Sequence, residues 1–167
     1  MIVYYFYFDA SALAKRYTQE DGSDKIDFLF ENAPLWRLSC LTIGAIEVFW
    51  ICVRKRNDGR ISDSQFAEST THLKLEVVDT LSNFKKIPVP DSLVWNSMDL
   101  IETYSLNSVD AMVLRSALDT ATALHSTDDR LVLVDSDQRL LRAAQAEGLQ
   151  IFNPEQDSQQ ILTDWIT

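Results

Sequence analysis

Four acidic residues occupy comparable places along this chain, each close to a point where an apolar segment passes into a helix. They are Asp9, Glu47, Asp110 and Asp137. Carboxylates that are brought close together repel one another unless a cation lies among them. Hard divalent ions such as Mg²⁺ and Mn²⁺ prefer oxygen ligands and commonly keep several waters. If the four side chains converge, they form a divalent-cation site.

Such a site would most simply activate a water molecule and steady a phosphodiester during in-line displacement, with one or two ions. Two other chemistries find no support in the sequence. His72 and His125 are isolated from Cys40 and Cys52, so the chain has no zinc-ligand spacing. The four glycines are scattered, so it also has no glycine-rich phosphate loop.

The aspartates also have a structural interpretation, because an aspartate just before a helix is often only its N-cap. This alternative stays open for Asp9, Asp110 and Asp137. Glu47 differs, because it lies among the apolar residues of 43–50. An unpaired charge is costly in such surroundings, which favours a role for Glu47 in a site.

The fourth acidic position has competitors. Asp135 lies two residues before Asp137, and Asp128 lies earlier in the same region. Asp137 is the preferred candidate, and Asp135 is the less favoured alternative.

Segment 1–17, MIVYYFYFDASALAKRY, must position the first acid. Its first eight residues are almost all apolar, β-branched or aromatic, which is typical of a strand covered on both faces. Good helix formers follow soon after Asp9. We therefore expect a central strand that presents Asp9 at the carboxyl edge of the sheet, where open parallel sheets bind ligands.

The remaining chain alternates between strand and helix patterns. Further strands are predicted at 36–41, 83–89, 131–134 and 149–152, and the prolines at 88 and 90 mark 83–89 as an edge strand. N-caps of the intervening helices are expected at Thr42, Ser62, Asp91 and Ser108. The helix after Asp91 is expected to place Leu93, Val94, Met98 and Ile101 on one apolar face. This order predicts an α/β domain with a mostly parallel sheet of about five strands, as one domain over 1–167.

The chain carries a formal net charge of −10, which repels phosphate backbones at long range. A nucleic-acid ligand would therefore need a local basic surface or a bound cation. Candidate RNA-binding residues are Lys15, Arg16, Arg54, Lys55 and Arg56, although a solvated face is the alternative for each. The tryptophans, Trp36, Trp50, Trp95 and Trp165, fit core or interface positions better than base-stacking platforms.

Cys40 and Cys52 each lie in an apolar segment, which fits small buried thiols and a reducing compartment. The N-terminal apolar run is too short to span a bilayer, and no basic residue precedes it. We therefore expect a soluble, cytoplasmic protein without membrane association.

Four sequence blocks resemble, in order and over nearly the whole chain, the PIN-domain family and particularly its VapC-like toxin ribonucleases. The blocks are FDASALAKRY, TIGAIEV, NSVDAMVLRSAL and VDSDQRLLRAAQAEGLQIFNP. The resemblance implies a three-layer α/β/α domain, a Mg²⁺- or Mn²⁺-dependent endoribonuclease site, and commonly a homodimer. It implies metal binding by Asp9, Glu47, Asp110 and Asp137, with Ser11 beside them as a supporting or water-orienting hydroxyl. Many such toxins pair with a small antitoxin that places a basic side chain near the acids.

Our hypothesis is a metal-dependent endoribonuclease in which a water made more acidic by the ion attacks RNA. Asp9, Asp110 and Asp137 would hold the ion, and Glu47 would help to bind it or orient the water. One rival is a PIN-like domain that holds RNA or a protein without cutting. Another is a phosphoacceptor or phosphatase-like domain with Asp9 as nucleophile, which Ser11 disfavours because a second Asp is expected there.

Overall fold

The structure is a computed structural model that describes residues 2–167, so Met1 of the predicted first strand lies outside it. It contains a five-stranded sheet in the order β3-β2-β1-β4-β5, in which every neighbouring pair is parallel. The strands are β1 (Tyr4–Phe8), β2 (Leu38–Leu41), β3 (Lys85–Ile87), β4 (Arg130–Val134) and β5 (Gln150–Phe152). The predicted α/β class and parallel five-stranded sheet are confirmed, as is the edge position of the third strand.

Helices connect and cover these strands. They are α1 (Ala10–Ala14), α2 (Ser23–Asn32), α3 (Thr42–Asn57), α4 (Asp63–Leu73), α5 (Asp91–Asn96), α6 (Met98–Tyr104), α7 (Ser108–Leu124), α8 (Gln138–Ala146) and α9 (Gln159–Ile166). Three short segments complete the order: η1 (Leu35–Arg37), the π-helical η2 (Lys74–Val78) and η3 (His125–Thr127). The second strand is therefore shorter than predicted, because 35–37 forms a 3₁₀ turn before it.

The first strand is central, as its sequence predicts. It pairs with β2 on one side and β4 on the other, and Phe8 is in register with both Cys40 and Val134. Successive strand residues face opposite sides, so Phe6 and Phe8 join one buried cluster and Tyr7 joins the other. The register aligns the carboxyl ends of all three strands, which places Asp9 and Asp135 at the same edge of the sheet.

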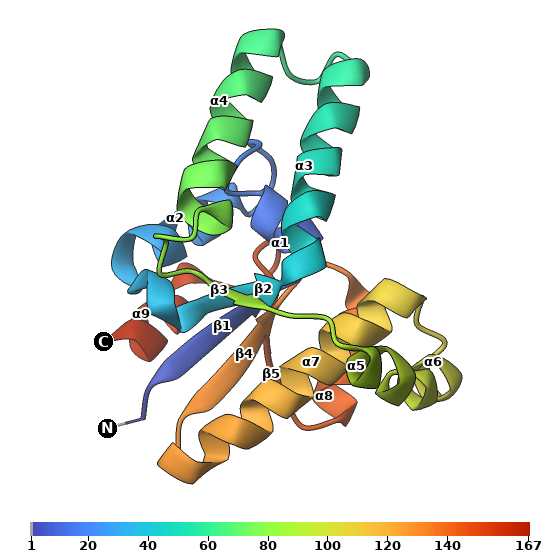
Figure 1. Cartoon of the computed structure of the whole chain (residues 1–167). Coiled ribbons are helices and arrows are strands. Elements are labelled where there is room, and N and C mark those ends of the chain that lie inside the picture. Colours follow the sequence, from blue (N-terminus) through green and yellow to red (C-terminus); the bar gives the residue numbers. More distant parts are fainter. Residues whose placement is uncertain (1) are drawn as a thin grey trace.

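Helices pack on both faces of the sheet and give three layers (Figure 1). The core around Phe6 and Phe8 takes side chains from α1, α2, α3, α4 and α9. The core around Tyr7 takes side chains from α5, α6, α7 and α8. The three-layer α/β/α arrangement is confirmed.

The α3 and α4 helices form a long hairpin that projects away from the sheet (Figure 1). Ser62 begins α4 with a capping box, in which it exchanges hydrogen bonds with Gln65. The predicted N-cap at Ser62 is confirmed. Because α3 starts at the end of β2, its first turns lie next to the edge of the sheet that carries Asp9.

The other three predicted N-caps are wrong by one residue. Thr42, Asp91 and Ser108 are the first residues inside their helices rather than the caps. The Thr42 hydroxyl donates instead to the carbonyl of Ile87 in β3, at 2.9 Å. Asn107 caps α7 in place of Ser108, and asparagine is as good a cap as serine.

The predicted helix from Asp91 is two helices, α5 and α6, separated at Ser97. The buried Ser97 hydroxyl donates to the carbonyl of Leu93 at 2.7 Å, a side-chain bond that competes with a regular helix. Because of this break, α6 does not continue α5 as one regular helix. The single apolar face is therefore wrong, because Val94, Met98 and Ile101 are all exposed.

Cys40 and Cys52 are buried free thiols, as predicted. Burial raises the pKa of both thiols, which keeps them protonated near neutral pH. In residues 2–167, no helix has both the length and the apolar character that a membrane crossing requires.

Candidate functional site

Asp9 follows the carboxyl end of β1 and is the N-cap of α1. Its Oδ2 accepts a hydrogen bond from the backbone N–H of Ser11 at 3.0 Å and lies 2.9 Å from the Ser11 hydroxyl. Within residues 2–167, no hydrogen bond reaches its Oδ1. Asp9 therefore has the structural role of a cap while one carboxylate oxygen stays available for a ligand.

Glu47 lies in the first half of α3, at a partly buried position. Burial, followed by the charges of Asp9 and Asp110, raises its pKa to about 7. Charges influence one another this strongly only at short range in a poorly solvated site. The structure therefore brings these three acids together, although they are far apart in the sequence.

Asp110 is the third residue of α7, one position later than predicted because Asn107 is the cap. The Asn107 Oδ1 accepts from the Asp110 backbone N–H, and its Nδ2 donates to Asp110 Oδ2, both at 2.8 Å. Burial and then Asp9 raise the pKa of Asp110, while the Asn107 bond opposes the rise. Asp137 raises this pKa further and Arg139 lowers it, so both also lie near the site.

Asp137 caps α8, and its Oδ1 accepts from the backbone N–H groups of Arg139 at 2.7 Å and Leu140 at 3.4 Å. As at Asp9, the capping bonds use one carboxylate oxygen. Asp128 precedes β4, so it lies at the opposite end of that strand from Asp137. The structure thus excludes Asp128 from this edge of the sheet.

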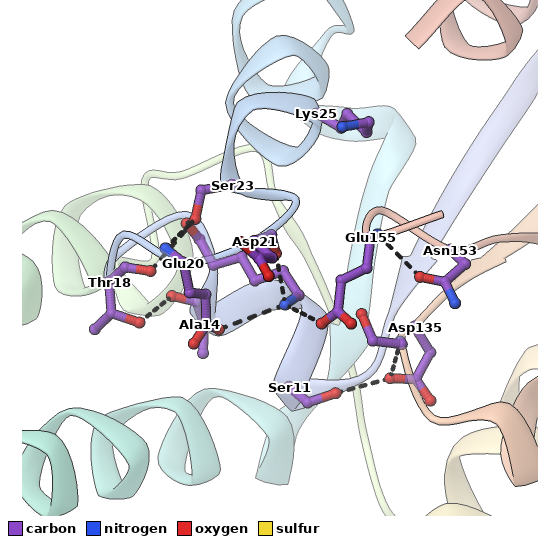
Figure 2. A network of polar contacts seen from close by, with 12 residues as sticks. Ser11, Ala14, Thr18, Glu20, Asp21, Ser23, Lys25, Asp135, Asn153 and Glu155 are labelled. Atoms are coloured by element: carbon purple, nitrogen blue, oxygen red, sulfur yellow. Dashed lines mark hydrogen bonds and ion pairs between the residues drawn. The ribbon is translucent and has the colours of Figure 1, made fainter. Parts of the chain in front are cut away.

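Asp135 is the most deeply buried acid of the group, with no exposed surface. Its Oδ1 accepts from the backbone N–H of Ser136 at 2.7 Å and lies 2.7 Å from the Ser11 hydroxyl, a contact drawn in Figure 2. Its Oδ2 is buried without a hydrogen-bond partner among the described residues. Burial and then Asp9 raise the pKa of Asp135 to about 7. Ser11 thus lies between Asp9 and Asp135.

An open pocket of about 420 Å³ lies over Asp9, Glu47 and Asp110, whereas Asp135 and Asp137 do not line it. Asp9, Ser11, Glu47 and Asp110 line one part of it, and Trp50 and Arg54 of α3 line another. The pocket therefore combines a carboxylate cluster with an aromatic ring and a cation. Residues of this kind can hold a metal ion and a phosphate-bearing ligand side by side.

The acids suit a hard cation by their chemistry. As the side chains stand, residues 2–167 contain no group of three or more Asp, Glu, His or Cys placed to hold a metal ion. Burial and then the charge of Asp9 nevertheless raise the pKa of Glu47, Asp110 and Asp135, and Asp135 Oδ2 has no partner among the described residues. A divalent ion among them would relieve the repulsion. The donor set therefore fits Mg²⁺ or Mn²⁺.

Three of the basic candidates form internal ion pairs. Lys15 and Lys55 are buried, which makes a solvated face wrong for both. Lys15 Nζ lies 2.7 Å from Glu155, and Lys55 Nζ lies 2.6 Å from Glu20. Arg16 pairs with Asp27 at 2.8 Å and with Glu76 at 2.9 Å. These contacts hold the fold together and leave little of the three cations for RNA.

Sequence reasoning missed three residues near the acids. Asn107 positions Asp110, and its only signal is that asparagine also caps helices well. Arg139 affects the pKa of Asp110 from the first turn of α8, a proximity that no local pattern indicates. Trp50 is 56% exposed and lines the pocket, whereas the sequence favoured core or interface positions for the tryptophans.

Comparison with known proteins gives one family. The family model described as PIN domain matches residues 6–137, which is most of the chain. No curated protein matches this sequence.

Proposed function

The chain belongs to the PIN-domain family, and on that premise we propose that it is a divalent-metal-dependent endoribonuclease. PIN domains are generally metal-dependent nucleases that act on nucleic acid. The observation that carries the proposal is that Asp9, Glu47 and Asp110 line one pocket at the carboxyl edge of the sheet, where burial and then the charge of Asp9 raise the pKa of Glu47 and of Asp110. A fold gains no stability from such repulsion, so its retention argues for a function.

We propose Asp9, Glu47, Asp110 and Asp137 as the residues that would hold Mg²⁺ or Mn²⁺. When bound, the ion would supply charge stabilisation at the scissile phosphate and a more acidic water. Glu47 lies beside Asp9 and Asp110 in the pocket, where its carboxylate would help to bind the ion or orient the attacking water.

Asp135 is the alternative to Asp137 as the fourth ligand. Its contact with the Ser11 hydroxyl supports a positioning role, because Ser11 also contacts Asp9 Oδ2. In this arrangement Asp135 fixes Ser11, and Ser11 fixes the rotamer of Asp9. Ser11 then acts beside the ligands, through the orientation of Asp9.

The direct test is cleavage of a single-stranded RNA by the purified protein with Mg²⁺, with Mn²⁺, and with EDTA. We expect cleavage with either ion, none in chelator, and none for Asp9→Asn. Asp63→Asn is the matched control, because the Asp63 side chain is 96% exposed on α4 and should keep full activity. Cleavage that persists in chelator or in Asp9→Asn would reject the mechanism.

We further propose that the protein is the toxin of a toxin–antitoxin pair, works as a homodimer in the cytoplasm, and forms one domain over 1–167. The similarity of the four sequence blocks to VapC-like toxins supports the first two points. Pairing of β5 and packing of α9 against the same core support the last. Co-purification with the product of a neighbouring small reading frame would test the antitoxin, and light scattering would test the dimer.

A second candidate is a PIN-like module that binds RNA or a protein without cutting. It is favoured by the absence, within residues 2–167, of a ready-made cluster of three metal-binding side chains. Calorimetric titration with Mn²⁺ separates the two functions. Binding that Asp9→Asn abolishes supports the nuclease, whereas no binding at millimolar Mn²⁺ supports the module.

A further inference from the structure

One face of α3 carries more than the acid Glu47. Glu47, Trp50, Ile51 and Arg54 are spaced so that they lie on the same side of a helix, and all four line the pocket over the acids. The helix that brings Glu47 to Asp9 therefore also directs an indole ring and a guanidinium toward the same pocket.

The indole of Trp50 is available to a ligand. It remains 56% exposed although the Arg54 guanidinium lies 4.7 Å from its ring centroid. Trp165, by contrast, stacks on Tyr4 at 5.4 Å, and Trp36 meets Tyr5 edge-on at 5.7 Å. No aromatic ring in the described part of the chain packs against Trp50 in this way. Its exposed area therefore stabilises the fold little.

The charge of Arg54 is also available. Arg54 is exposed, and no carboxylate of residues 2–167 forms an ion pair with it. Lys15, Arg16 and Lys55 all have such partners. In a chain of net charge −10, an uncompensated cation beside the acidic pocket provides the local attraction that a phosphate needs.

We propose that Trp50 and Arg54 form a nucleotide subsite beside the acids: an unpaired base stacks on the indole, and the adjacent phosphate contacts the guanidinium. Stacking of this kind requires an unstacked base, which a continuous duplex does not offer. The inference rests on the proposed nuclease function and adds two substrate-binding residues to it.

The test measures binding separately from cleavage. Asp9→Asn protein is titrated into a fluorescein-labelled single-stranded 10-mer RNA without added metal, and anisotropy gives the dissociation constant. In this background we expect Trp50→Ala to weaken binding about 5- to 100-fold, and Trp50→Phe to retain much of the affinity. Arg54→Ala should weaken binding and reduce the salt slope by about 0.7.

Trp95→Ala is the matched control, because Trp95 is also exposed, at 66%, but lines a different pocket. It should leave RNA affinity unchanged. A blunt duplex of the same sequence should bind more weakly than the single strand, and Trp50→Ala should remove that difference. Equal affinities for Trp50→Ala and Trp95→Ala, or a duplex bound as tightly as the single strand, would overturn the subsite.

The two proposals fail in different ways. If Trp50→Ala binds RNA normally while the wild type still cleaves with Mn²⁺, the subsite is wrong and the nuclease stands. If Trp50→Ala loses binding while the wild type cleaves nothing with any ion, the subsite stands and the nuclease is wrong.

Discussion

Two clusters of ionisable side chains adjoin the two ends of α1, with Asp9 before its first residue and Lys15 after its last, and their charges are arranged in opposite ways. One, which we call the paired cluster, consists of Lys15, Glu20, Lys55 and Glu155. The other, the acidic cluster, consists of Asp9, Glu47, Asp110, Asp135 and Asp137. Figure 2 shows Glu20 and Glu155 of the paired cluster, and Asp135 of the acidic cluster with Ser11 beside it.

The difference lies in the sign of the neighbouring charges. In the paired cluster, a hydrogen bond from Lys15 lowers the pKa of Glu155, and the buried cations have their counter-charges. In the acidic cluster, burial and like charges raise the pKa of Glu47 and Asp135 to about 7. Charge that is compensated internally supports the fold, whereas charge left uncompensated is available for a ligand.

The largest expected effect is on activity, from Glu47→Gln in the acidic cluster. Removing this carboxylate should reduce RNA cleavage about 10²- to 10⁴-fold, because it takes away a group placed at the reaction. The unfolding free energy in urea should stay the same or rise, since a repulsive charge is lost. A variant that is inactive and also unfolded at low urea would show that Glu47 mainly supports the fold.

In the paired cluster, the variant Lys55→Met should have the opposite effect to Glu47→Gln, because it should reduce stability rather than cleavage. This change removes the closer of the two cations beside Glu20 and the donor to the Thr18 hydroxyl, and should lower the unfolding free energy by about 1–3 kcal/mol. Cleavage per folded molecule should be unchanged. Urea denaturation with a cleavage assay measures both quantities, and an activity loss beyond the unfolded fraction would contradict the separation of the two clusters.

A smaller effect concerns pH. The raised pKa of Glu47 means that the fold favours its protonated form, so the stability it contributes is present below about pH 4.5 and lost as pH rises toward 7. Asp135 acts in the same direction between about pH 3.8 and 7. In EDTA, the unfolding free energy should therefore fall as pH rises over this range. Glu47→Gln should flatten the profile, and an unchanged profile would contradict the raised pKa.

The smallest expected effect comes from Asn107→Ala. Loss of the cap should cost about 1 kcal/mol, and the pKa of Asp110 should rise because the Asn107 bond no longer opposes burial. Cleavage should fall together with stability. Ser62→Ala removes a comparable cap at the far end of the α3–α4 hairpin, and should cost similar stability without altering cleavage.

The sequence predicted the parallel sheet because β1 and β4 are continuous apolar runs, and such runs are typical of strands covered on both faces. It failed at helix ends. The helix that begins at Asp91 is interrupted at Ser97, and Asn107 rather than Ser108 caps α7. Neither choice follows from hydrophobic periodicity.

Within the site, the acids could be named because Asp9 and Asp137 follow strands, Glu47 lies in the helix after a strand, and Asp110 lies at a helix start. The depth of Asp135 could not be predicted, since it depends on β5 and on Ser11 packing beside it. The ion pairs of Lys15 and Lys55 could not be predicted from the sequence either, because their partners Glu155 and Glu20 come from loops. Tertiary neighbours, rather than local pattern, decide whether a charge is paired.

The position of β4 has a consequence for biosynthesis. β1 gains this neighbour only when residues 130–134 have been translated and have left the ribosome, because Tyr4 pairs with Arg130 and Phe8 with Val134. Asp135 and Asp137 emerge directly behind that strand. A nascent chain therefore cannot assemble the acidic cluster before β4 and the residues that follow it have left the ribosome.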